Sequence, residues 1–109
     1  MKAISEEDVQ KAVDWLRDNA EACAKARATR IYLEEYRKSI KALLMSKYQD
    51  LSVSAQEREA YAHDDYISHL KTLKEAIYQD ERFRFFRASA EVKIEAWRTQ
   101  QANIRAIKI

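Results

Sequence analysis

The 109-residue sequence contains neither glycine nor proline. At average usage of roughly 7% Gly and 5% Pro, a chain of this length would hold about thirteen of them. Tight β-hairpin turns depend on Gly, Asn-Gly or Pro positions. Phosphate-binding loops, dinucleotide-binding folds and nucleophile elbows depend on glycine. The sequence therefore predicts an all-α protein and excludes these glycine-dependent sites.

The first helix has a clear start signal. Ser5 and Asp8 have the spacing of a capping box, in which each side chain bonds to the backbone of the other. Ile4 and Val9 occupy the positions of a hydrophobic staple around this cap. Nothing breaks the helical pattern before Lys47, so the sequence predicts one helix over about residues 5–48.

Residues 49–54 interrupt this pattern with Asp50, Ser52 and Ser54, which compete with a helix for backbone hydrogen bonds. The run Ser54-Ala55-Gln56-Glu57 is a capping box and predicts a short helix over about 54–62. Aspartates at 64 and 65 can cap a final helix over about 64–106, whose apolar stripe slips near Asp80. This break in the spacing of the apolar residues predicts a stutter, an interruption of the heptad repeat.

Two long helices joined by a short segment predict a single domain, residues 1–109, folded as a long antiparallel, coiled-coil-like hairpin. With the pivot near Glu57, Ala28 lies opposite Phe86 and Ala20 lies opposite Ile94. Small residues of one helix then face large residues of the other, which keeps the packing density even.

The apolar residues spread more widely than one seam requires. A surface of this kind favours self-association, so we expect a homodimer in which two hairpins form a four-helix bundle. The alternative is a three-helix monomer in which the 54–62 segment folds over one end.

The charges are nearly balanced, with 20 Lys and Arg against 18 Asp and Glu. Basic residues nevertheless come level in the expected hairpin and alternate with phenylalanines. Arginine beside exposed aromatics is typical of nucleic-acid-binding surfaces and of protein-binding hot spots, whereas a solvated helix face gives the same pattern. The candidate partner- or nucleic-acid-binding residues are Lys25, Arg27, Arg30, Arg82, Arg84, Phe85, Arg87 and Lys93.

The sequence predicts neither a catalytic residue nor a metal, cofactor or small-molecule site. His63 and His69 are six residues apart, so they point away from each other on a helix. An ion pair between Asp65 and His69 is favoured over a zinc site. The single cysteine, Cys23, cannot form an internal disulfide. Because no apolar run is long enough to span a membrane, we expect a cytoplasmic protein.

The stretch Trp97-Arg98-Thr99-Gln100-Gln101-Ala102-Asn103-Ile104-Arg105, with Tyr32-Leu33-Glu34-Glu35-Tyr36, resembles short helical proteins of tailed bacteriophages that are often encoded near early recombination and replication genes. The resemblance implies a non-enzymatic accessory protein in the host cytoplasm. It would act in phage DNA recombination or replication by contacting a protein or single-stranded DNA. Two alternatives are an inhibitor that blocks a host nuclease or defence complex, and a structural assembly protein.

Overall fold

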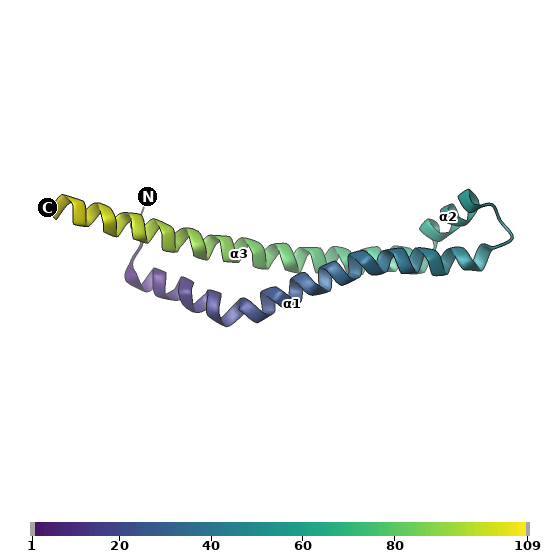
Figure 1. The fold of residues 1–109 in the computed structure, drawn as a ribbon. Helices are drawn as coiled ribbons and strands as arrows, with labels where there is room; N and C mark the ends of the chain where they lie inside the picture. Colours follow the sequence, from purple (N-terminus) through teal and green to yellow (C-terminus); the bar gives the residue numbers. More distant parts are fainter. Residues whose placement is uncertain (1, 109) are drawn as a thin grey trace. The chain divides into compact units, whose positions relative to one another are not determined.

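The computed structural model describes residues 2–108 and contains three α-helices, α1 (Glu6–Met45), α2 (Val53–Ala62) and α3 (Asp64–Lys108) (Figure 1). A 3-10 turn, Ser46–Tyr48, follows α1 directly. Residues 2–108 contain no strand, and the predicted all-α fold is confirmed. The chain divides into two compact units, which we call the central unit (Lys25–Asp80) and the terminal unit (Met1–Ala24 with Glu81–Ile109).

The start of α1 is the predicted capping box. The Ser5 backbone N–H donates to Asp8 Oδ2 at 3.0 Å, and the Asp8 N–H donates to Ser5 Oγ at 3.1 Å. Ile4, the residue before the cap, is hydrogen-bonded to Gln100 of α3 within the terminal unit. The Ile4 N–H donates to Gln100 Oε1 at 3.2 Å, while Gln100 Nε2 donates to the Ile4 carbonyl at 2.8 Å. The cap therefore fixes the helix start, and Gln100 fixes where the chain enters it.

The start of α2 differs from the prediction. Ser52, rather than Ser54, is the N-cap, because its backbone is extended and its Oγ accepts a hydrogen bond from the Ala55 N–H. Ser54 already lies inside the first turn. The helix ends at Ala62. The next residue, His63, has an extended backbone, and its Nδ1 accepts a hydrogen bond from the Asp65 N–H. His63 thus separates α2 from α3.

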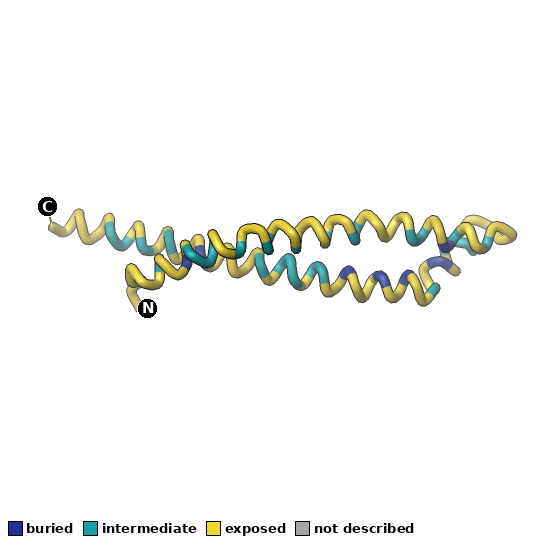
Figure 2. The backbone as a smooth tube through the Cα atoms, turned by 90° about the horizontal axis from the view of Figure 1, so that it is seen from below, coloured by how far each residue is buried: buried dark blue, intermediate teal, exposed yellow. Residues whose placement is uncertain are grey.

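The best-buried cluster of the central unit forms where α1, α2 and α3 meet (Figure 2). Leu44, Ala60 and Tyr66 are buried there, one from each helix, and Ile40 and Met45 pack around them. Lys41 of α1 reaches α2, where its Nζ lies 3.4 Å from Glu57 Oε1. The short helix therefore lies against the end of α1, as the three-helix alternative expected.

The seam between α1 and α3 follows a heptad spacing in both units. The less exposed α1 residues include Ala12, Leu16, Asn19 and Cys23 in the terminal unit and Ala26, Arg30, Leu33, Ile40 and Leu44 in the central unit. On α3 they include Tyr66, His69, Leu73, Ala76, Asp80, Phe83, Ala90, Ile94, Trp97 and Gln101. The spacing between successive seam residues alternates between three and four. Arg37 and Arg87 also fall on this spacing, but their side chains are exposed. The predicted stutter near Asp80 is wrong, because Asp80 itself occupies a seam position.

The two helices run antiparallel within each unit, but the predicted register is wrong. Phe86 packs against Trp15, with ring centroids 5.9 Å apart, instead of against Ala28. The shift along α1 is thirteen residues at Phe86, ten at Gln100, which bonds to Ile4, and four at Asp80, which bonds to Arg30. The short helix α2 causes this shift, because it lies along the last turns of α1. The helix α3 therefore begins opposite an earlier part of α1 than a pivot near Glu57 predicts.

Candidate interaction surface

The eight predicted binding residues belong to two different units. Lys25, Arg27 and Arg30 lie on α1 in the central unit. Arg82, Arg84, Phe85, Arg87 and Lys93 lie on α3 in the terminal unit. We therefore describe their surroundings separately.

Arg30 is a seam residue with carboxylates on two sides. Its Nη1 lies 3.0 Å from Asp80 Oδ2 on α3, and its Nε lies 3.0 Å from Glu34 Oε1 on its own helix. The Arg30 side chain is 31% exposed and that of Asp80 is 18% exposed. Arg30 therefore links two helices, whereas the neighbouring Lys25 and Arg27 are exposed.

The arginines of the terminal unit have partners on α3 itself. The Arg82 guanidinium lies over the Phe86 ring, 5.3 Å from its centroid. Arg84 Nη1 lies 3.2 Å from Glu81 Oε2, and a further pair, Arg87 with Glu91, has its nearest atoms 3.9 Å apart. Much of the positive charge of this segment is therefore balanced by neighbouring glutamates.

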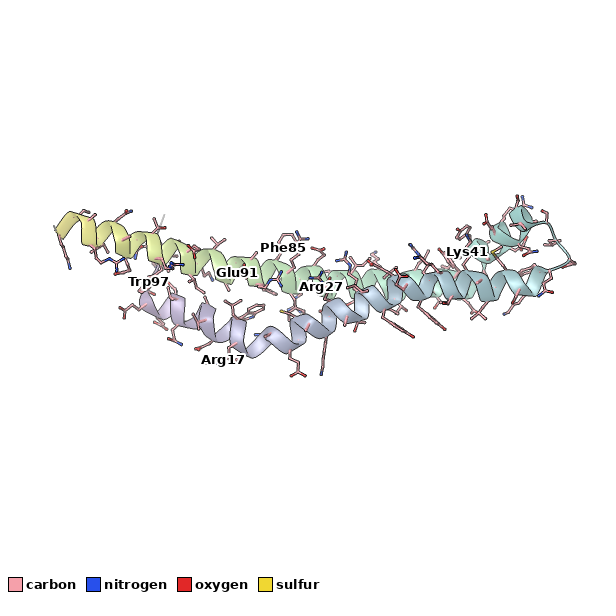
Figure 3. The ribbon with its side chains drawn as sticks, in the orientation of Figure 1. Arg17, Arg27, Lys41, Phe85, Glu91 and Trp97 are labelled. Carbon is pink, nitrogen blue, oxygen red and sulfur yellow. The ribbon has the colours of Figure 1, made fainter. Side chains whose placement is uncertain are left out.

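Phe85 and Val92 form an apolar stripe on the outer side of α3. They are 69% and 65% exposed and lie seven residues apart, two turns along one face. Figure 3 shows Phe85 on the side of α3 that faces away from the α1 segment of its unit. Val92 also lines a shallow hollow with small and acidic neighbours, Ala88, Glu91, Glu95, Ala96 and Thr99. Val92 is one of the widely spread apolar residues that predict a partner surface, but it was not predicted as a binding residue, although its heptad spacing from Phe85 is visible in the sequence.

A second surface feature, a groove between α1 and α3 in the central unit, was also missed. Its floor is formed by small and apolar residues, and charged residues stand on its two rims. The lining residues are Lys25, Ala26, Thr29 and Leu33 from α1 and Thr72, Glu75, Ala76 and Gln79 from α3. No hydrophobicity pattern indicates this groove, because it arises from small side chains that face each other across the seam.

Both histidines form hydrogen bonds with backbone groups, His63 at the start of α3 and His69 across the seam to α1. His69 is buried, and its Nε2 lies 2.8 Å from the Leu33 carbonyl, so this nitrogen donates the hydrogen bond. The predicted ion pair between Asp65 and His69 is wrong, because His69 bonds to the Leu33 carbonyl and the Asp65 backbone N–H donates to His63 Nδ1 at 3.0 Å. Within residues 2–108, no three His, Cys, Asp or Glu side chains are grouped so that they could hold a metal ion.

Comparison with protein families, with characterised proteins and with solved structures gives no match. The resemblance to helical phage proteins therefore stays a prediction. Within the described part of the chain, none of the helices has the length and apolar character needed to cross a membrane.

Proposed function

We propose that this protein works by contact, without catalysis, and that it binds a helix of a partner protein along the outer face of α3 in the terminal unit. The observation that carries the proposal is the exposure of Phe85 and Val92 two turns apart on one face. Ala88, Ala96 and Thr99 extend this face with small side chains, which allow a second helix to approach closely. Exposed aromatics beside arginines are typical of binding hot spots.

The charge arrangement favours a protein over a nucleic acid as the partner. A nucleic-acid surface needs several cations that neutralise phosphates, whereas Arg84 and Arg87 already have glutamate partners. In the setting that the phage resemblance implies, the partner is a protein of phage DNA recombination or replication.

Photo-crosslinking tests this surface. A photoreactive phenylalanine analogue at Phe85 should trap one defined protein in producing cells, and the double variant Phe85→Ser/Val92→Ser should fail to retain that protein. The same analogue at Lys71, an exposed position on α3 in the central unit, is the matched control. Binding of a labelled single-stranded oligonucleotide that weakens steeply with salt and persists in the double variant would instead support the nucleic-acid alternative.

A further inference from the structure

The flank beside the groove of the central unit is uncharged at five positions, and Asp65, seven residues before Thr72 on α3, is a charged position on the same flank. Along α1, Thr29, Tyr36 and Leu43 follow one another at seven-residue spacing, and Thr72 and Gln79 do so along α3. These positions flank the heptad seam on the same side as the groove. None of them is charged, and four of them are exposed, since only Gln79 is partly buried.

The opposite flank of α1 has a different character. The corresponding residues there are Arg27, Glu34 and Lys41. Lys41 contacts Glu57 and lies 4.9 Å from the centroid of the Tyr61 ring, so α2 lies on this side. Depletion of charge at the centre of a patch distinguishes interfaces from ordinary surface. The groove side is therefore the flank of the central unit that is suited to burial.

The chain also exposes more surface than its size explains. Its accessible surface is 8439 Å², whereas a folded monomer of this mass exposes about 6,300 Å². The excess of about 2,000 Å² is larger than the roughly 800 Å² that each partner contributes to a standard interface. This surface belongs to both units of the chain, so the area that a second copy can cover is counted on the groove side of the central unit alone.

We propose that a second copy of this chain docks on the groove of the central unit, with the two copies parallel and α1 of each copy lying over α3 of the other. The groove side from Ala26 to Leu43 is about 25 Å long and, two helices wide, about 20 Å across. Two copies then bury at least about 1,000 Å², the size at which a specific interface begins.

The charges on the two rims determine the relative orientation of the copies. Lys25 stands on the α1 rim and Glu75 on the α3 rim of the same groove. A twofold axis parallel to the helices brings Lys25 of one copy opposite Glu75 of the second copy, twice per dimer. A twofold axis perpendicular to the helices would instead place α1 of one copy on α1 of the other. In that orientation Lys25 does not meet Glu75 of the second copy.

Sedimentation equilibrium of the full chain measures this state directly. We expect twice the 12.8 kDa chain mass for the wild-type protein. Thr29→Glu and Thr72→Glu each place a charge in the buried groove and should weaken self-association by more than about a hundredfold. Ala28→Glu, on the neighbouring exposed position outside the groove, should leave the dimer intact. Circular dichroism establishes that each variant keeps its helices.

A mixing experiment tests the orientation. Lys25→Glu alone and Glu75→Lys alone should each be monomeric, because like charges meet twice in either homodimer. Mixed in equal amounts, the two variants should form a heterodimer in which both pairs are again opposite in charge. A monomeric wild-type protein, a Thr29→Glu chain that stays dimeric, or variants that fail to associate when mixed would each overturn the proposal.

Discussion

The guanidinium of Arg30 lies 3.0 Å from the carboxylate of Asp80, and both residues occupy heptad positions of the seam between α1 and α3. Each side chain is less than one-third exposed. When Asp80 is lost, the partly buried Arg30 keeps Glu34 on its own helix but loses its partner across the seam, whereas the loss of both Arg30 and Asp80 removes this cost.

We therefore expect Asp80→Ala to lower the free energy of unfolding by about 1–3 kcal/mol, a value reduced from that of a fully buried pair because water still reaches Arg30. The double variant Arg30→Leu/Asp80→Leu should return to within about 1 kcal/mol of the wild type. Urea unfolding followed by circular dichroism measures both. Asp18→Ala is the control, since its exposed pair with Arg17 should contribute less than about 1 kcal/mol.

The cap of α1 predicts a pH dependence. The pKa of Asp8 is lowered from its ordinary value of 3.8, because the Ser5 backbone N–H and then the Ser5 side chain hydrogen-bond to its carboxylate. A lowered pKa in the folded state gives stability that is present above pH 3.8 and is lost as the pH falls through the folded value. Asp8→Asn should therefore lower the melting temperature at pH 7, and the difference should vanish in acid.

A carbon-detected NMR titration measures the pKa of the Asp8 carboxyl group itself. Ser5→Ala removes the side-chain partner and should raise this pKa toward the ordinary value. A wild-type carboxyl group that titrates at or above pH 3.8 would contradict the capping arrangement.

We expect the contacts of Lys41 to hold α2 against the end of α1. The pKa of Lys41 is raised, chiefly by its hydrogen bond with the Tyr61 side chain and further by Glu57. Both partners lie on α2. Lys41→Met should therefore speed amide hydrogen exchange in residues 53–62 by about two- to fivefold.

Exchange along the rest of α1 and α3 should stay unchanged in this variant. Lys38→Met is the matched control, because Lys38 pairs with Glu35 on its own helix and does not reach α2 through that pair. Equal acceleration in both variants would show that the Lys41 contacts do not hold α2.

The register can be tested by chemical cross-linking in the terminal unit. In a Cys23→Ser background, the pair Trp15→Cys/Phe86→Cys should react with a short bis-maleimide, because the native rings lie 5.9 Å apart. The pair Ala20→Cys/Ile94→Cys represents the register predicted from the sequence and should stay uncross-linked. Mass spectrometry distinguishes the two results, and the reverse result would restore the predicted register.

Local features of this fold follow from the sequence, because their causes are local. The absence of Gly and Pro predicts helices, and Ser5 and Asp8 predict the first residue of α1. The register does not follow in the same way. Arg30, His69 and Asp80 are polar, so a stripe chosen by hydrophobicity excludes them, although paired partners allow all three to lie in the seam.

The candidate site was predictable only in part. Phe85 and its arginines are visible as a composition, but their glutamate partners and the outer position of Phe85 depend on the helix geometry. To predict the groove, one must know the register of α1 against α3 and the position of α2. No sequence motif encodes either of these.

The large accessible surface described above also governs how the chain responds to denaturant. The urea dependence of unfolding scales with the area newly exposed, and a single copy exposes about a fifth less new area than a typical protein of its mass. Its transition should therefore be broad, and a given change in urea concentration should shift a smaller fraction of molecules between the folded and unfolded states than it does for a typical protein of this mass.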